Sequence, residues 1–172
     1  MTLLPFKPVF EPLGNQHDRA AFYCGTESLD RYLRQQASQD LRRRLAVTYV
    51  MLDSRSNKVA GYYTLTNYKI DVGELPPEIA RRIPYPDVPA TLIGRLAIDL
   101  NYQGHGLGRV LLMDALHRSL LGSYQVASLA VVVDAIDDTA RSFYEHHDFI
   151  RSSTNSYRLF LPMSTIQQLF QG

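Results

Sequence analysis

A turn with three glycines in five positions joins an apolar stretch to a segment with helical periodicity. The glycines are Gly104, Gly106 and Gly108, and the flanking segments, residues 91–99 and 106–122, predict a buried strand and a helix. Backbone N–H groups at such a turn, together with the helix N-terminus, favour an anion such as a pyrophosphate. The alternative interpretation is a tight strand-to-helix turn that binds no ligand.

Two common nucleotide-binding loops do not fit this turn. The phosphate loop of nucleotide hydrolases needs a Lys-Ser or Lys-Thr pair after its last glycine, whereas Arg109 and Val110 follow Gly108 here. A dinucleotide-binding turn has the spacing G-x-G-x-x-G and an acidic residue about 20 residues later. Here the spacing is G-x-G-x-G, and Tyr124 stands at that distance. The turn therefore indicates a pyrophosphate site that needs no metal ion.

The remaining pattern predicts an α+β domain with three layers, α/β/α. Apolar residues recur every four positions on one face of a helix that Ser28 is expected to cap: Leu29, Leu33, Ala37, Leu41 and Leu45. A hairpin of two strands, 46–53 and 59–70, and a proline-rich loop, 71–90, come next. The elements after the glycine turn are a helix, a strand, a helix and two strands, over residues 106–122, 127–135, 137–147, 148–153 and 156–162. Their order implies one parallel strand pair in a mixed sheet.

Composition predicts a globular protein without a metal site. The 172 residues are 45% hydrophobic and 20% charged, which is typical of one folded domain, residues 1–172. No apolar run is long enough to span a membrane, and the first residues lack the pattern of a secretory signal. Cys24 is the only cysteine, and no cysteine–histidine metal spacing exists. We therefore expect a cytoplasmic protein with no membrane association.

Arginine dominates the basic residues, since only three of the 18 are lysine. Arg42, Arg43 and Arg44 end the first predicted helix. One interpretation is a favourable interaction with the helix C-terminus on a solvated face. The other is contact with phosphates, which the planar guanidinium fork suits well.

The spacing Gln103-x-x-Gly106-x-Gly108 resembles the acetyl-CoA loop of the GNAT family of N-acetyltransferases. The strand Ile93–Ile98 is similar to the family strand whose backbone pairs with the pantetheine arm, and Ala140–Glu145 with Phe149 is similar to its A-x-x-F-Y-E…G-F segment. The resemblance covers roughly residues 45–162. It implies the GNAT fold, with a mostly antiparallel sheet whose parallel pair is splayed at the acetyl-CoA site.

The resemblance also implies which residues hold acetyl-CoA. They are Leu96, Ala97, Ile98, Gln103, Gly104, His105, Gly106, Leu107, Gly108, Arg109, Asp137 and Ser142. Asp137 stands where this fold often has an asparagine, and since an acid has no amide hydrogen to donate, helix capping is its other interpretation. Asp148 replaces the usual glycine before Phe149, and aspartate tolerates positive φ better than most residues.

The resemblance assigns catalysis to Tyr144, whose phenol would protonate the leaving thiolate. The alternative is a core aromatic beside Phe143. We find no compelling general base, because the four histidines from residue 105 onward are expected at the surface or at helix ends. An α-amine has a reference pKa near 7.7–8.0 and is partly neutral at cell pH, so a water relay would suffice. We therefore expect an α-amine substrate rather than a lysine side chain.

The resemblance extends to the acetyltransferase toxins of type II toxin–antitoxin pairs. Six stretches carry it: 22–25, 29–33, 36–37, 40–44, 61–65 and 89–97. It implies acetylation of the α-amine of aminoacyl-tRNA, a block of translation, a ribbon-helix-helix antitoxin as partner, and a homodimer. The implied tRNA-binding residues are Arg34, Arg42, Arg43, Arg44 and Arg95. For Arg95, which lies in a strand, a paired structural role is equally open.

Two other functions remain open at this point. One is a GNAT enzyme that acetylates a small-molecule amine or a protein N-terminus. The other is a CoA-binding interaction module or corepressor with little catalytic activity. The arginine-rich first half argues against cationic small substrates, and the intact glycine turn and Tyr144 argue against loss of catalysis.

Overall fold

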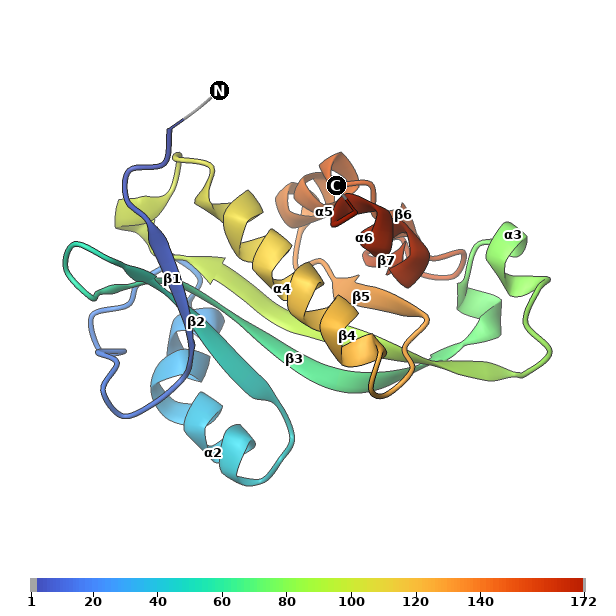
Figure 1. The fold of residues 1–172 in the computed structure, drawn as a ribbon, viewed down its shortest axis with the longest axis horizontal. Helices are drawn as coiled ribbons and strands as arrows, with labels where there is room; N and C mark the ends of the chain where they lie inside the picture. Colours follow the sequence, from blue (N-terminus) through green and yellow to red (C-terminus); the bar gives the residue numbers. More distant parts are fainter. Residues whose placement is uncertain (1–2, 172) are drawn as a thin grey trace. The chain divides into compact units, whose positions relative to one another are not determined.

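The computed structural model describes residues 3–171, in which seven strands form one mixed sheet (Figure 1). The strands are β1 (Pro8–Pro12), β2 (Val47–Asp53), β3 (Val59–Asp71), β4 (Asp87–Ile98), β5 (Ala130–Asp134), β6 (Ile150–Arg151) and β7 (Arg158–Pro162). Their order across the sheet is β1-β2-β3-β4-β5-β7-β6. β4 and β5 are parallel, with Thr91 opposite Val131. The predicted mixed sheet with a parallel pair around the glycine turn is confirmed.

Six α-helices lie between and after these strands in the described part of the chain. They are α1 (Glu27–Arg31), α2 (Ala37–Arg42), α3 (Pro77–Ala80), α4 (Leu107–Ser123), α5 (Asp138–His146) and α6 (Met163–Leu169). A π-helical segment, η1 (Tyr32–Gln36), joins α1 to α2, and two short 3-10 segments, η2 (Val72–Glu74) and η3 (Leu100–Tyr102), precede α3 and α4.

The chain divides into two compact units. The first unit contains Met1–Thr66 and Gly94–Ala115, and the second contains Asn67–Ile93 and Leu116–Gly172. β3, β4 and α4 each continue from one unit into the other. The expectation of one domain over residues 1–172 stays a prediction.

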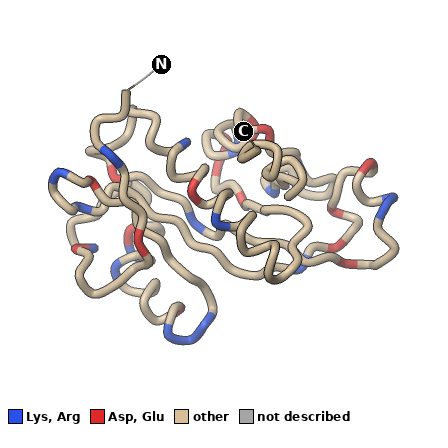
Figure 2. Tube along the Cα trace, viewed as in Figure 1, with Lys and Arg blue, Asp and Glu red and all other residues tan. Residues whose placement is uncertain are grey.

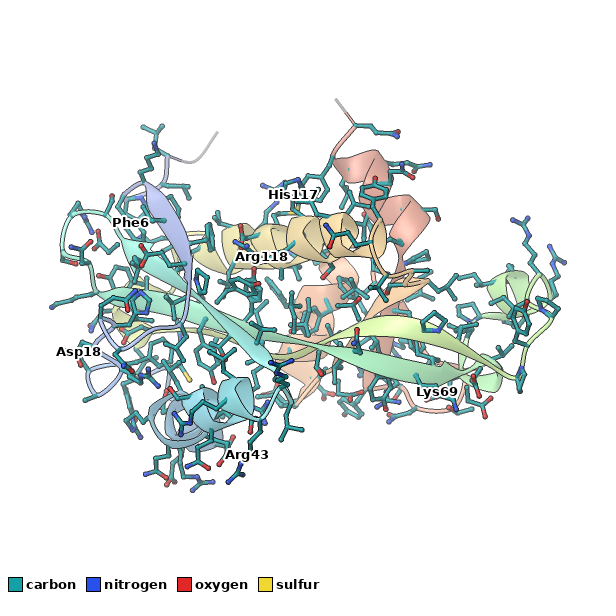
Figure 3. The ribbon with its side chains drawn as sticks, turned by 60° about the horizontal axis from the view of Figure 1, so that its bottom comes forward. Phe6, Asp18, Arg43, Lys69, His117 and Arg118 are labelled. Carbon is teal, nitrogen blue, oxygen red and sulfur yellow. The ribbon has the colours of Figure 1, made fainter. Side chains whose placement is uncertain are left out.

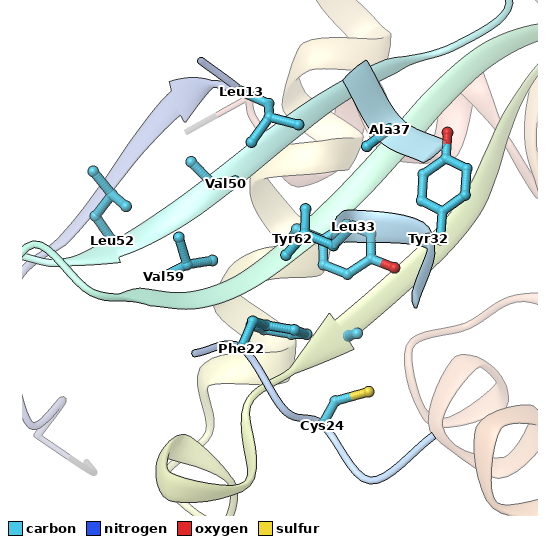
Figure 4. Packing of buried hydrophobic residues seen from close by; sticks show 11 residues of the cluster. Leu13, Phe22, Cys24, Tyr32, Leu33, Ala37, Val50, Leu52, Val59 and Tyr62 are labelled. Carbon is cyan, nitrogen blue, oxygen red and sulfur yellow. The ribbon is translucent and has the colours of Figure 1, made fainter. Parts of the chain in front are cut away.

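In the first unit, helices cover both faces of the β2–β3 hairpin. Leu33 and Ala37 pack with Val50 and Tyr62 on one face (Figure 4). On the other face, the Tyr63 hydroxyl donates to Asp114 of α4 at 2.6 Å. Successive strand residues point to opposite faces, which is why the neighbours Tyr62 and Tyr63 contact different helices. This arrangement agrees with the predicted α/β/α layers.

β3 and β4 approach each other closely at Gly61. A β-carbon at this position would lie 2.8 Å from Ile98 Cδ1 and 2.9 Å from the carbonyl oxygen of Ala97. A backbone atom cannot move aside as a flexible side chain can, so glycine is required here. This close approach fixes the end of β4, from which the glycine turn departs.

The helix expected between residues 24 and 46 differs from the prediction in its start and in its apolar face. α1 begins at Glu27 after Thr26, so Ser28 is not its N-cap. Leu41 and Leu45, expected on the buried face, are 39% and 58% exposed. Ala37, directly after η1, is still fully buried, so the expected face continues through it. α2 ends at Arg42, so Leu45 lies beyond the helix, where a spacing of four residues no longer predicts burial.

Two elements were not predicted, and a third begins earlier than expected. β1 pairs antiparallel with β2, with Pro8 opposite Asp53. Prolines at both ends of β1 hide the strand in the sequence, yet they are tolerated because β1 lies at the edge of the sheet. α6 follows β7 directly, and β4 begins at Asp87 instead of residue 91.

The second unit is built on β5 and β7, which pair antiparallel with Val132 opposite Phe160. These two residues share a core cluster with Ile70 of β3 and Val88 of β4. Ile166 of α6 is fully buried as well. The unit thus has an apolar core of its own.

Asp53 ends β2 and links the hairpin to the segment before the glycine turn. Its carboxylate accepts hydrogen bonds from the Arg55 guanidinium at 3.0 Å and from the Tyr102 hydroxyl at 2.8 Å. The side chain is almost completely buried. The Arg55 hydrogen bonds hold the pKa of this carboxyl well below its usual range. Asp53 is therefore charged in the folded protein at neutral pH.

We expect Asp53→Asn to lower the free energy of unfolding by about 1–3 kcal/mol at pH 7, because charge-assisted hydrogen bonds are lost. A lowered pKa in the folded state stabilises the protein above the unfolded-state pKa of about 3.9, and this contribution disappears as pH falls further. Urea unfolding between pH 3 and 7 tests both points. The variant should lose less stability than the wild type on acidification, and parallel curves would contradict the assignment.

Candidate functional site

The glycine turn adopts the left-handed backbone that a nest of N–H groups requires. Gly104 has φ 82° and Gly106 has φ 76°. A β-carbon at either position would meet no heavy atom within 4 Å. Glycine is therefore needed for the backbone conformation and not for lack of space, and the turn opens onto free volume. α4 begins directly afterwards, at Leu107, so its N-terminus adds positive potential.

The Gln103 side chain holds the turn in place. Its Nε2 donates to the carbonyl oxygen of Ile98 at 2.8 Å and to that of Cys24 at 3.2 Å. These bonds join the last residue of β4 to the segment before α1. The sequence assigned Gln103 to cofactor binding, and the structure gives its amide this additional positioning role.

Asp99, next to the end of β4, makes a second connection to the segment before α1. Its carboxylate accepts from the backbone N–H of Asn101 at 2.9 Å and of Tyr23 at 3.0 Å. The backbone N–H of Leu100 also donates to the Tyr23 carbonyl, at 2.9 Å. The base of the turn is thus clamped on both sides, while the glycines themselves remain free to face a ligand.

The end of β4 presents alternating side chains. Ala97 is buried in the cluster under α1 and α2. Leu96 and Ile98 are half-buried and point to the other face. Their side chains are thus packing residues, as expected if only their backbone groups were to contact a cofactor. His105 and Arg109, the charged candidates of the turn, are exposed.

Tyr144, on α5, is 8% exposed and packs between Phe143 and Phe149, with ring centroids 5.3 Å away in both cases. The packing agrees with the alternative interpretation, a core aromatic beside Phe143, while the catalytic role stays a prediction. Among residues 3–171 its hydroxyl has no hydrogen-bond partner. Burial raises the pKa of this phenol well above its usual value. The group therefore stays protonated at neutral pH and keeps a proton to donate.

The other candidates of the second unit lie at the two ends of α5. Asp137 accepts the backbone N–H of Ala140 at 2.8 Å, which makes it the N-cap. Ser142 is exposed on the same helix. Asp148 follows the helix with φ 71°, so the position does require the left-handed backbone that aspartate tolerates. Helix capping by Asp137 is confirmed, and its contact with a cofactor stays a prediction.

The predicted tRNA-binding arginines belong to the first unit, in two different environments. Arg42 ends α2, and Arg43 and Arg44 follow it; all three are exposed and form a continuous basic stretch in Figure 2. Figure 3 shows the Arg43 side chain directed away from the strands. Arg34 is exposed too, with one guanidinium nitrogen bonded to the Phe22 carbonyl at 3.2 Å. Arg95 is half-buried, and its guanidinium carbon lies 3.5 Å from the centroid of the Tyr32 ring.

Residues 80–166 match the family described as an acetyltransferase (GNAT) domain. The chain belongs to the GNAT family. The expected fold and the acetyl-CoA-dependent acetyltransferase activity are thereby confirmed. GNAT enzymes take an acetyl group from acetyl-CoA, and binding of its pyrophosphate at the glycine turn stays a prediction.

Two curated relatives cover nearly the whole GNAT chain. A tRNA-acetylating toxin of Mycobacterium tuberculosis is 34% identical over 157 residues, which are 91% of this chain and 93% of the toxin. A probable toxin TacT of Sinorhizobium fredii is 31% identical over 172 residues, with 95% of each chain covered. The toxin subfamily suggested by the short sequence stretches is therefore supported along the full length.

Solved GNAT toxins share the fold closely. A Tyr-to-Phe mutant of KacT superposes with a TM-score of 0.89 at 29% identity, covering 95% of this chain and 99% of KacT. AtaT complexed with acetyl-methionyl-tRNAfMet has a TM-score of 0.88 at 29% identity, covering 96% and 100%. A mutant AtaT bound to acetyl-CoA and to the C-terminus of the antitoxin AtaR has a TM-score of 0.81 at 27% identity, covering 96% and 99%.

No helix within residues 3–171 is long and apolar enough to cross a membrane. In the same part of the chain, no group of three or more His, Cys, Asp or Glu side chains is arranged to hold a metal ion.

Sequence reasoning missed the polar neighbours of Arg95 in this GNAT fold. Tyr32 and Gln36 donate to the Asp40 carboxylate at 2.7 Å and 2.9 Å, and Tyr32 carries the Arg95 stack. Only the spacing of Tyr32, Gln36 and Asp40 hinted at a common face. Nothing in the local sequence linked that face to β4.

We expect Gly106→Ala to raise the KM for acetyl-CoA about tenfold. The methyl group disfavours the left-handed backbone by about 1–2 kcal/mol and enters the open volume before the turn. The space around the turn tolerates the methyl group, but the backbone strain is present in the free enzyme too, so the melting temperature should fall by a few degrees. Gly122→Ala is the matched control, because that glycine also faces open space but has no positive φ. An unchanged KM in Gly106→Ala would show that the pyrophosphate does not use this turn.

Proposed function

We propose that this GNAT enzyme transfers the acetyl group of acetyl-CoA to the α-amine of aminoacyl-tRNA and acts as a translation-blocking toxin. The observation that carries the proposal is the rigidly clamped glycine turn, open to a ligand at Gly104 and Gly106, in a chain 34% identical to a tRNA-acetylating toxin. AtaT, complexed with acetyl-methionyl-tRNAfMet, supports the choice of acceptor.

On the cofactor side, the proposal uses both the strand end and the turn. The backbone of Leu96–Ile98 pairs with the pantetheine arm. The turn from Gln103 to Arg109 binds the pyrophosphate through backbone N–H groups, with the α4 N-terminus behind them. Asp137 and Ser142 contact the cofactor from α5. The glycines supply the close approach that any β-carbon would prevent.

The transfer itself is one substitution at the thioester carbonyl. The neutral α-amine attacks, the C–N bond forms and the C–S bond breaks. Tyr144 donates its phenolic proton to the departing thiolate, and the proton of the attacking amine passes to water. The Tyr144 hydroxyl, which has no hydrogen-bond partner among residues 3–171, supports the donor role. An α-amine needs no strong protein base, because its reference pKa of about 7.7–8.0 leaves much of it neutral.

On the RNA side, the exposed arginines Arg34 and Arg42–Arg44 bind backbone phosphates. Such contacts position an RNA without reading its sequence, so they suit a substrate whose identity resides in its amino acid. In the free protein the side chains of Arg42–Arg44 extend into solvent. They can therefore meet phosphates without first breaking internal contacts.

The proposal includes the partners that the toxin subfamily implies. A ribbon-helix-helix antitoxin would bind and silence the enzyme, as supported by AtaT bound to the C-terminus of its antitoxin AtaR. We also propose a homodimer in the cytoplasm. The splay of β4 from β5 at the acetyl-CoA site belongs to the same proposal.

The test is transfer of labelled acetyl from acetyl-CoA to a pool of charged tRNAs by the purified protein. We expect label on the aminoacyl group of one or a few tRNAs, lost in Tyr144→Phe. Label on lysine peptides at a faster rate, or on small amines with none on any charged tRNA, would leave an acetyltransferase with another acceptor. Absence of any acetyl-CoA turnover would favour a binding module.

A further inference from the structure

Arg95 combines partial burial with unused hydrogen-bond donors. Its guanidinium stacks on Tyr32, with 3.5 Å from its central carbon to the ring centroid. Among residues 3–171 it makes no hydrogen bond and no ion pair. The five N–H donors of a guanidinium lie in its plane, so stacking occupies a face and leaves the edge free. Because polar groups withdrawn from water are normally paired, this edge is suited to an external acceptor.

The platform under Arg95 is rigid. Tyr32 is 5% exposed, and its hydroxyl donates to Asp40 Oδ2 at 2.7 Å. Asp40 Oδ1 accepts from Gln36 Nε2 at 2.9 Å. Both carboxylate oxygens are thus occupied, and Asp40 attracts Arg95 without hydrogen-bonding to it. Burial raises the pKa of Tyr32 to about 12, so the ring remains neutral beneath the cation.

The platform lies at a local irregularity of the helix. Tyr32 begins the π-helical segment η1 and Gln36 ends it. Tyr32, Gln36 and Asp40 are spaced four residues apart, which is the spacing of neighbours on one helical face. Irregular turns of this kind are costly in an α-helix and occur often at functional sites. The helix therefore departs from regularity at the place where it carries the Arg95 stack.

The position of Arg95 along β4 indicates which ligand it meets, and this step rests on the proposed function. Arg95 directly precedes Leu96–Ile98, whose backbone is proposed to hold the pantetheine arm. At about 3.3 Å per residue, its Cα lies within about 10 Å of that backbone along the strand. The acceptor amine has to reach the thioester. The RNA nearest to Arg95 is then the aminoacylated 3′ end.

We propose that Arg95, held on Tyr32, binds a backbone phosphate of the single-stranded 3′ end of tRNA and positions the aminoacyl group for acetylation. A guanidinium edge matches two phosphate oxygens in a charge-assisted, bidentate contact. Arg95 thereby differs from the exposed Arg42–Arg44, which would hold the RNA farther from its end. A phosphate of CoA has the same chemistry, and the test separates the two sources.

The probe is a pool of uncharged tRNA, either intact or with its terminal CCA removed, titrated against the wild type and three variants over a range of salt. We expect Arg95→Gln to bind intact tRNA about tenfold more weakly, with the salt slope reduced by about 0.7, and to bind truncated tRNA like the wild type. Arg95→Lys should bind intact tRNA more weakly but keep the salt dependence of binding, because lysine retains the charge and lacks the planar guanidinium. The matched control, Arg43→Gln, should weaken both RNAs equally.

Three results would overturn the role of Arg95. The first is an equal loss of affinity for intact and truncated tRNA, and the second is no loss of affinity for intact tRNA. The third is a raised KM for acetyl-CoA with unchanged RNA affinity, which would assign the phosphate to CoA. Melting curves show whether Arg95→Gln folds. If Arg95→Gln does not fold, the tRNA affinity of Arg95→Lys tests the role of Arg95. If the wild type acetylates charged tRNA and both Arg95 variants do so equally well, only the role of Arg95 is wrong. If the wild type acetylates no charged tRNA, the proposed function is wrong as well.

Discussion

Tyr144→Phe is expected to lower kcat for acetyl transfer about 100- to 10,000-fold, the usual contribution of a general acid. The phenol is buried between two aromatic rings, and its hydroxyl contacts no acceptor among residues 3–171. Removing that oxygen leaves the packing intact, so the melting temperature should hardly change. The KM for acetyl-CoA should also stay near the wild-type value, because cofactor binding is assigned to the glycine turn and β4.

Steady-state kinetics with charged tRNA measure this effect, and Tyr124→Phe is the matched control at an exposed tyrosine. The pH dependence gives an independent check. Since burial raises the pKa of Tyr144, the donor stays protonated through pH 10. The rate should rise as the substrate amine loses its proton near pH 8 and then stay level. A decline of the rate close to pH 10 would show that the essential acid is a group with an ordinary phenol pKa, or a different residue.

The second large effect is expected from neutralising the exposed turn after α2. Replacing Arg42, Arg43 and Arg44 together by glutamine should weaken tRNA binding about 100-fold near 0.15 M salt and lower the salt slope by about 2–3. The reason is counterion release, to which each neutralised phosphate contributes. Binding titrations of total tRNA at several salt concentrations give both numbers.

Arg81→Gln with Arg82→Gln is the control for a general effect of charge, because both arginines are exposed in the second unit and no RNA contact is assigned to them. This double variant should bind tRNA nearly as well as the wild type. If wild-type binding itself does not respond to salt, phosphate contacts do not drive it. The arginines after α2 would then form only a solvated helix end, and a small acceptor would be the better interpretation.

The glycine turn and the ends of α5 were predictable because their geometry is local. Gly104 and Gly106 have positive φ, as a ligand-binding turn between strand and helix requires. Asp137 caps the helix through a backbone N–H three residues ahead. Asp148 takes up the left-handed conformation at a position where the family has glycine. In each case the residue type alone restricts the backbone within a few residues.

The first helix shows where such reasoning stops. A spacing of four predicts burial of Leu45 only if the helix continues to it, and α2 ends at Arg42. β1 gave no signal either, because its strand character comes from pairing with β2 and not from its proline-containing sequence. Both outcomes depend on what the segment packs against.

By itself the sequence determined the order of the elements around the glycine turn, the flexible glycine backbone of that turn, the two ends of α5 and the family. Only the tertiary structure decided that Gln103 clamps the turn to Cys24 and that Arg95 stacks on Tyr32. It also decided that Tyr144 is buried while its hydroxyl has no hydrogen-bond partner among residues 3–171. The physical reason is how far apart along the chain the interacting residues lie. Backbone preferences act between neighbours in the chain, whereas burial and the pairing of distant side chains depend on how the whole chain packs.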